Sequence, residues 1–210
     1  MIGKLFGAAA VLKKQTEIYQ PKFGSLALGY DGAFPSTALV DRRTLMDMLG
    51  ETGIVRMYGQ SADWLKFYLD GKTLWVASSP IGVNTGYNTL KNKLLFSGTR
   101  IITIANKRYK VRALSGINNS TSEWNKLMYR VAADSPIDPA ERWANYTTLA
   151  LTQAATGNGG TAIYSISPEL NTANRVILRG RTTIAAEFGI GTTETYSDIG
   201  WRPVLELINE

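Results

Sequence analysis

The sequence predicts an α+β domain in which a mostly antiparallel sheet is accompanied by two or three helices. Three observations support this fold class: β-rich runs joined by short turn pairs, a few short amphipathic helix patterns, and no regular alternation of strand and helix. Without that alternation, we expect few parallel strands. At 210 residues, the chain is long enough for one core that buries about 70% of the unfolded surface.

Two hairpins are the clearest local predictions. Residues 64–78 (WLKFYLDGKTLWVAS) place Asp70-Gly71 between two β-rich runs, and this pair tolerates the positive φ angles of a type I′ turn. Residues 100–114 (RIITIANKRYKVRAL) alternate apolar and polar side chains on either side of Asn106-Lys107. We expect Asn106 to adopt the left-handed conformation at this second turn.

A helix is predicted over residues 41–49 (DRRTLMDML). Asp41 is placed to accept hydrogen bonds from the first-turn amides, and Gly50 follows where the helix is expected to end. The face expected to be buried consists of Leu45, Met48 and Leu49.

Two more helices are predicted in the second half of the chain. Ser120 and Glu123 have the spacing of a capping box, and Asp138-Pro139 is a typical helix start because proline suits the first helical position. The expected buried stripe of the first consists of Trp124, Leu127, Met128 and Val131. The expected inner face of the second consists of Trp143, Tyr146 and Ala150.

The chain then returns to strand-like segments, of which residues 175–178 and 201–208 are the clearest. In the last segment, Trp201 is expected to be a core anchor. Arg202 then faces the opposite way, towards a carboxylate or a carbonyl oxygen. Pro203 has no amide hydrogen, so we expect it at a sheet edge or a bulge.

The first 22 residues read as an arm, which gives two parts: an N-terminal assembly arm (1–22) and a single α+β domain (23–210). Apolar side chains of the arm are expected to pack against a neighbouring protein, while its paired lysines meet an acidic surface. These predicted docking residues are Ile2, Leu5, Phe6, Val11, Leu12, Lys13 and Lys14.

Composition excludes several classes of function. The chain has no cysteine and no histidine, so we expect no Cys/His metal site, no thiolate or imidazole catalysis, and no cofactor. No apolar run is long enough to span a membrane. The net charge is +6, but the basic residues are spread out. This favours a solvated surface or an acidic protein partner over nucleic acid.

Aromatic residues offer the only candidate binding groups. The tryptophans are expected mainly in the core, since each lies on an element with an apolar face, although a stacking platform for sugars or bases is the alternative. Tyrosines in predicted loops are the candidate ligand contacts, namely Tyr58, Tyr87, Tyr164 and Tyr196. Scattered carboxylates leave one enzymatic alternative, glycan hydrolysis by two acids that the fold brings together.

Ordered blocks over about residues 28–208 resemble a family of virion structural proteins of tailed bacteriophages. The most specific blocks are SEWNKLMYRV at 122–131 and GWRPVLEL at 200–207. The last block is also similar to the final strand of C-type-lectin-like and formylglycine-generating-enzyme-like domains. Of the lectin calcium motif only Trp124-Asn125 is present, and the cysteines of the enzyme are absent. The resemblance therefore implies a C-type-lectin-like scaffold without calcium and without that catalysis.

The resemblance implies a structural component of a bacteriophage particle, located in the virion at the tail, the collar or neck, or as a decoration. Its partners would be other virion proteins of a tail, neck or capsid ring, with several copies of the chain in the particle. We expect no enzymatic activity. The alternative is a host-surface glycan-binding (receptor-binding) module, and a carboxylate-based glycan hydrolase is the third hypothesis.

Overall fold

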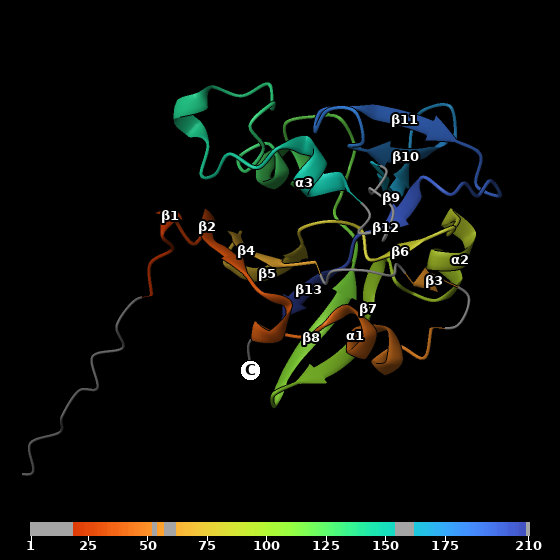
Figure 1. Cartoon of the computed structure of the whole chain (residues 1–210), viewed down its shortest axis with the longest axis horizontal. Coiled ribbons are helices and arrows are strands. Elements are labelled where there is room, and N and C mark those ends of the chain that lie inside the picture. The colour runs from red at the N-terminus through yellow and green to blue at the C-terminus, as the bar shows by residue number, and fades with distance from the viewer. Residues whose placement is uncertain (1–18, 52–53, 57–61, 154–161, 209–210) are drawn as a thin grey trace, which may run out of the picture.

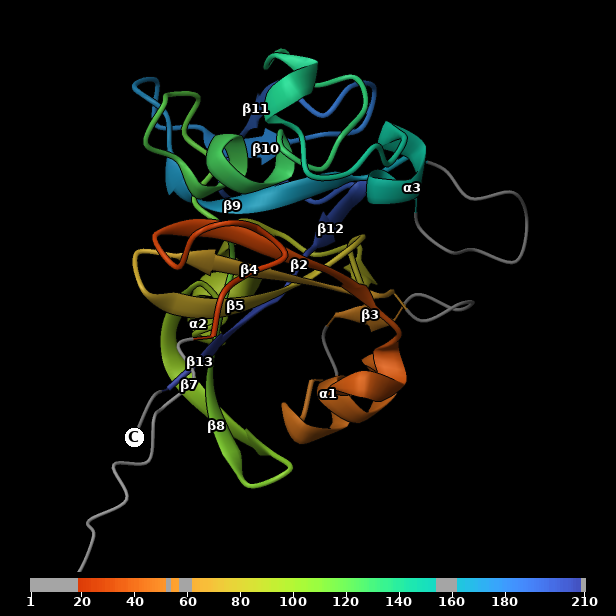
Figure 2. The ribbon, with the colours of Figure 1, turned by 90° about the vertical axis from the view of Figure 1, so that its left-hand side faces the viewer.

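The computed structural model describes residues 19–51, 54–56, 62–153 and 162–208. These residues form two mostly antiparallel sheets with short helices, which confirms the predicted α+β class. Figures 1 and 2 show β9, β10 and β11 above β2, β4 and β5, with the end of the chain running from the upper group to the lower one.

The first sheet has the strand order β1-β2-β4-β5-β13-β8-β7, and all its neighbouring strands are antiparallel. Its strands are β1 (Phe23–Gly24), β2 (Leu28–Phe34), β4 (Trp64–Leu69), β5 (Lys72–Ala77), β7 (Ser97–Ile104), β8 (Lys107–Arg112) and β13 (Val204–Leu207).

The second sheet has the order β11-β10-β9-β12-β6-β3. Its strands are β3 (Val55–Arg56), β6 (Gly82–Val83), β9 (Tyr164–Leu170), β10 (Val176–Arg179), β11 (Glu187–Ile190) and β12 (Ile199–Trp201). β12 and β9 run parallel, unlike the other pairs of this sheet. This parallel pair brings the segment before Ile199 beside the start of β9.

Both predicted hairpins are confirmed. Asp70 and Gly71 join β4 to β5 with φ angles of 50° and 76°. At the β7–β8 turn the positive φ angles belong to Ala105 (48°) and Asn106 (63°). The prediction of Asn106-Lys107 was therefore displaced by one residue, because Lys107 already pairs with Ile104 as the first residue of β8.

The end of the chain passes from one sheet to the other. Trp201 pairs with Gly82 in the second sheet, and Val204 pairs with Val76 and Arg112 in the first. Pro203 lies between β12 and β13, where the strand is interrupted, so its missing amide hydrogen breaks no ladder. Trp201 is fully buried, as predicted for a core anchor.

The helix predicted at 41–49 is α1 (Arg42–Met48), and the Asp41 carboxylate accepts from the Thr44 amide at 3.0 Å. Its inner face differs from the prediction in one position. Leu45 and Leu49 are buried as expected, but Met48 is 46% exposed and Met46 is buried in its place. The helix has only two turns, so the packing of its ends sets which residues face inward. Two further α-helices are α2 (Tyr87–Asn92) and α3 (Thr148–Thr152).

The predicted capping box after Ser120 is wrong. Residues 124–128 form a short π-helix, and the Glu123 carboxylate binds the Arg112 guanidinium and the Ser115 amide. A charged partner from β8 therefore competes successfully for the glutamate. The predicted stripe is nevertheless confirmed, since all its members are buried: Trp124, Leu127, Met128 and Val131.

The segment after Asp138 is shorter than predicted. It forms a single 3-10 turn (Pro139–Glu141), which the Asp138 carboxylate caps by accepting from the Ala140 amide at 2.8 Å. Trp143 and Tyr146 pack against the core, whereas Ala150 lies in the separate helix α3 and is exposed. Another 3-10 turn spans Ser36–Ala38.

Two hydrophobic cores lie on opposite faces of the first sheet. Alternation along β13 separates them, because Val204 belongs to one core and Leu205 to the other. One core joins the sheet to α1, α2 and the second sheet, and the other joins it to the π-helix and the segment around Trp143. Within the described ranges, no helix has the length and apolar character needed to cross a membrane.

Candidate functional site

All the predicted docking residues lie outside the part of the chain that the structure describes. This applies to Ile2, Leu5, Phe6, Val11, Leu12, Lys13 and Lys14, and to the predicted ligand contact Tyr58. The remaining part of the predicted arm, residues 19–22, packs against the domain. The Tyr19 hydroxyl and the Lys22 amide both donate to the Asp31 carboxylate of β2.

Asp31 is the centre of a cluster that fastens residues 19–22 to β2 and β4. The Tyr68 hydroxyl donates to its carboxylate at 2.7 Å, and the Lys66 ammonium lies 2.7 Å away. The same ammonium lies 4.9 Å from the centre of the Tyr19 ring. Burial acts to raise the pKa of Asp31, but the bonds from Lys66, Tyr19 and Tyr68 prevail and hold this pKa below its usual value.

Tyr87 does not have the loop position that the sequence suggested. It is the first residue of α2 and only 8% exposed. Its hydroxyl donates to the carbonyl oxygen of Pro168 at 3.2 Å, and its ring packs against Phe96. These contacts leave little of the ring for a ligand and indicate a structural role.

The other two predicted tyrosines come together in one surface pocket of about 290 Å³. Tyr164 begins β9 and Tyr196 lies in the segment before β12. The parallel pairing places Ile199 opposite Tyr164, and the Tyr164 amide donates to the Asp198 carbonyl at 2.9 Å. The pocket is lined by Tyr164, Leu178, Arg181, Phe188, Ile190, Tyr196, Asp198 and Ile199.

Aromatic rings give the pocket an open apolar surface. Tyr164 and Phe188 stack with ring centres 5.9 Å apart and an angle of 21° between their planes. Phe188 is 51% exposed and Tyr196 is 49% exposed, although both are large and apolar. Exposed aromatic faces beside a concavity are typical of ligand-binding surfaces.

The polar side of the pocket is an ion pair. The Arg181 guanidinium lies 2.7 Å from the Asp198 carboxylate and 5.2 Å from the centre of the Tyr164 ring. Arg181 has a φ of 90°, a conformation that is costly for a residue with a side chain. The tight β10–β11 connection fixes this backbone, with the Gly180 amide donating to Ala186 at 3.0 Å. Strain of this kind occurs preferentially at functional sites.

Sequence reasoning missed Phe188 and Arg181, and it considered Asp198 only as one of several scattered carboxylates. A weak signal existed for Phe188, because Glu187-Phe188-Gly189 places a large aromatic between a charged residue and a glycine in a short strand. No signal existed for Arg181 and Asp198, which are 17 positions apart and meet only because β10, β9 and β12 are neighbours.

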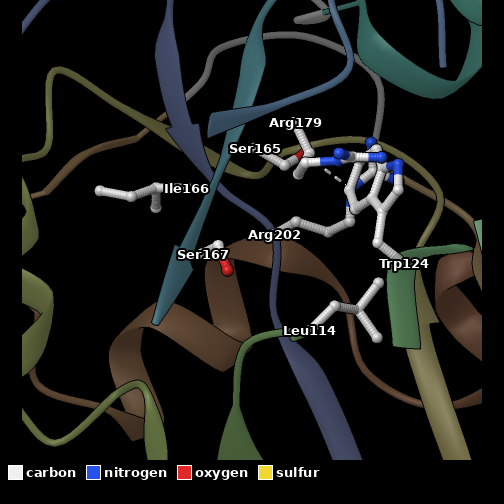
Figure 3. Close-up of a pocket in the computed structure, with 7 residues that line it drawn as sticks. All are labelled: Leu114, Trp124, Ser165, Ile166, Ser167, Arg179 and Arg202. Atoms are coloured by element: carbon white, nitrogen blue, oxygen red, sulfur yellow. Dashed lines mark hydrogen bonds between the residues drawn. The ribbon is translucent and has the colours of Figure 1, made fainter. Parts of the chain in front are cut away.

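A second, buried cavity lies between two arginines and Trp124 (Figure 3). The guanidinium carbons of Arg179 and Arg202 lie 5.9 Å and 5.3 Å from the centre of the Trp124 ring. Arg179 binds the Glu187 carboxylate at 2.9 Å, and also Asn125 and Tyr129. The cavity therefore lies inside a packed, highly polar cluster.

Arg202 is bound by oxygens that carry no charge. It donates to the Ser165 hydroxyl at 3.0 Å and to the carbonyl oxygens of Ala77, Ser78 and Leu151. This confirms that Arg202 faces away from Trp201 and towards carbonyl groups. Complete burial lowers the pKa of Arg202 to about 9, because the charged form is poorly solvated there.

The scattered carboxylates on which the glycan hydrolase hypothesis depended mostly have structural partners. Glu123 binds Arg112, Glu187 binds Arg179, and Asp138 caps a 3-10 turn. In the part of the chain that the structure describes, no three Asp or Glu residues gather into a metal site. What the surface pocket can do chemically is stack a ring and hydrogen-bond its substituents. Comparison with protein-family models, with curated proteins and with solved structures gives no match to this chain.

Proposed function

We propose that this chain is a non-catalytic, C-type-lectin-like domain that binds carbohydrate in the pocket formed by β9, β10, β11 and the segment before β12. The observation that carries the proposal is that exposed aromatic faces and the Arg181–Asp198 ion pair, whose arginine has a strained backbone, line the same concavity. A sugar ring has an apolar C–H face and polar edges, which matches these two surfaces.

The aromatic side supplies most of the binding free energy. A ring face of a sugar can stack on Phe188 and Tyr196, both about half exposed, and each such contact is worth about 0.5–1.5 kcal/mol beyond the area that it buries. The polar side fixes orientation, since Asp198 accepts from hydroxyl groups and Arg181 donates to them. A volume of about 290 Å³ lies at the lower end of small-molecule sites, which favours one or two sugar units over a long chain.

The ion pair favours binding over hydrolysis. A glycosidase needs two carboxyl groups across the glycosidic bond, one of them held protonated. Asp198 is the one carboxylate among the pocket-lining residues, and it is already bound to the Arg181 guanidinium at 2.7 Å. This arrangement suits a hydrogen-bond acceptor better than a general acid.

A place in a bacteriophage particle stays a prediction that rests on the sequence resemblance. The feature that bears on it is the Asp31 cluster, which fastens residues 19–22 to β2 and β4 where the predicted assembly arm joins the domain. A glycan-binding domain is compatible with that role, because exposed virion domains contact the host surface. The two proposals are separate, and the following experiment tests only the first.

Glycan-array binding followed by titration calorimetry tests carbohydrate recognition. We expect Phe188→Ala and Tyr196→Ala each to weaken binding by about 2–12-fold, which corresponds to the loss of one stacking contact of about 0.5–1.5 kcal/mol. We expect the double variant to abolish binding. Ile101→Ala is the matched control, since it removes a similarly exposed apolar side chain from β7, far along the other sheet.

Folding of each variant is checked by circular dichroism. If the wild type binds a glycan and the double variant binds it equally well, the result would contradict this site. Absence of binding to any glycan in an array that includes bacterial cell-wall and capsule sugars would contradict the function itself.

A further inference from the structure

The buried cavity beside Trp124 combines positive charge with hydrogen-bond donors that lack acceptors. It holds about 10 Å³ and is lined by Leu114, Trp124, Ser165, Ile166, Ser167, Arg179 and Arg202. Arg179 and Arg202 are 0% and 2% exposed, so neither guanidinium has access to bulk water. Figure 3 shows both side chains gathered at the indole of Trp124.

The donors exceed the acceptors in this cluster. Among the described residues, the Arg179 Nε has no hydrogen-bond partner although it is buried. Arg202 has five N–H groups, and its described bonds use Nε, both hydrogens of Nη1 and one of Nη2. The Ser165 hydroxyl accepts from Arg202 and keeps its own hydrogen to donate.

The charges are equally unbalanced. Glu187 forms an ion pair with Arg179, but no carboxylate in the described ranges lies within ion-pair distance of Arg202. Glu169 is the other nearby acid. It accepts from the Ser167 hydroxyl and from the Gly116 amide at 3.0 Å, and it does not line the cavity. Of the two buried guanidinium groups, only that of Arg179 is bonded to a carboxylate, and an unpaired buried charge such as Arg202 is costly at low dielectric.

Size selects among the anions that can relieve this imbalance. A cavity of about 10 Å³ has room for one water-sized species. Phosphate, sulfate and carboxylates are too large, and the walls from Leu114, Ile166 and Trp124 favour an ion that is weakly hydrated. Chloride comes closest to both conditions, because it is monatomic, only slightly larger than water, less strongly hydrated than fluoride, and able to accept hydrogen bonds from several directions.

We propose that the cavity between Arg179, Arg202 and Ser165 binds one chloride ion, which accepts hydrogen bonds from these three residues and completes the core behind β9. This site is independent of the sugar pocket and of its function. It joins β9, β10 and the connection between β12 and β13 around a single ion, so chloride stabilises the fold rather than taking part in recognition.

The test is the thermal unfolding of the full chain in sodium gluconate, with chloride or bromide replacing gluconate at constant ionic strength. We expect a saturable rise of about 3–6 °C in the unfolding midpoint when the halide is tenfold above its dissociation constant. Equal midpoints in chloride and gluconate would overturn the proposal. Constant ionic strength removes the general screening effect of salt.

Variants assign the effect to the cavity. Ser165→Ala removes one donor and keeps both charges, so we expect the apparent dissociation constant of chloride to rise about tenfold. Ser97→Ala is the control, because Ser97 is exposed in β7 and its chloride response is expected to match the wild type. Loss of Ser165 also lowers stability in gluconate, so only the difference between chloride and gluconate is compared.

A bromide-soaked crystal gives the direct readout. An anomalous peak within hydrogen-bond distance of the Arg179 Nε and the Ser165 hydroxyl supports the site. Density for a water molecule in the cavity, with no anomalous signal, contradicts it.

Discussion

Arg181 and Arg202 show two opposite uses of the same side chain in one molecule. Arg181 is partly exposed, is paired with Asp198 and lies over the Tyr164 ring in an open pocket. Arg202 is fully buried, lies over the Trp124 ring and binds carbonyl and hydroxyl oxygens instead of a carboxylate. Both use an aromatic face, but only Arg181 keeps an accessible polar edge.

The difference shows how burial separates an arginine that holds the core together from one that stays accessible at the surface. The Arg202 guanidinium bonds to β5, α3 and β9, three elements that are far apart in the sequence. The cavity beside it has room for no more than one small species. The Arg181 pair holds together only the rim of a pocket, so its removal should cost little stability. Substitutions that separate the unfolding free energy from ligand binding test this contrast.

The largest expected effect belongs to Arg202→Met. The variant keeps a long side chain but leaves the carbonyl groups of Ala77, Ser78 and Leu151 without their donor. We expect the free energy of unfolding to fall by about 3–4 kcal/mol, measured by urea denaturation. The paired control is Arg181→Met, for which the expected loss is under about 1 kcal/mol. Similar losses for the two variants would break the comparison.

An intermediate effect is expected from the backbone of Arg181. Its φ of 90° is strained for any residue with a Cβ and relaxed for glycine. Arg181→Gly and Arg181→Ala remove the same ion pair, so their difference isolates the backbone. We expect Arg181→Gly to be about 1 kcal/mol more stable than Arg181→Ala in urea denaturation, with sugar binding weakened equally in both. The opposite order of stability would show that the backbone is unstrained.

The smallest effect concerns Asp31, a third aromatic-flanked ion pair. The folded-state pKa of Asp31 is held below the usual 3.8, so its contribution is present at neutral pH and is lost as the pH falls through the folded pKa. The free energy of unfolding of Asp31→Asn, measured by urea denaturation, should therefore be lower than that of the wild type at pH 7 by roughly 1 kcal/mol or less. This difference in free energy should become smaller below about pH 4. A gap that is constant between pH 7 and pH 3 would contradict this account.

Local sequence rules predicted the elements that depend on neighbouring residues. The Asp70-Gly71 hairpin, the Asp41 cap and the buried stripe beginning at Trp124 all appear in the structure. Predictions were wrong where a distant group intervened. Glu123 has the spacing of a capping residue, but Arg112 from β8 binds it bidentately, and a charged partner outweighs a backbone amide.

The candidate site also shows which features neighbouring residues predict and which depend on distant contacts. The sequence predicts Tyr164 and Tyr196 as loop tyrosines, and both line the pocket, although Tyr164 is the first residue of strand β9. Tyr87 was chosen on the same grounds and is buried in α2. Nothing in a single sequence distinguishes these cases, because the exposure of a ring depends on the elements that pack over it.

The sequence alone determined the α+β class, the short-range turns, and the lack of thiol and imidazole chemistry, since each follows from residue type or from spacing within about ten positions. Only the tertiary structure decided which residues meet. The parallel pairing of β12 with β9 creates the surface pocket, and the passage from β12 to β13 buries Arg202. Both depend on contacts between segments that lie tens of residues apart, and the free energy of such contacts comes from packing and desolvation that no local pattern records.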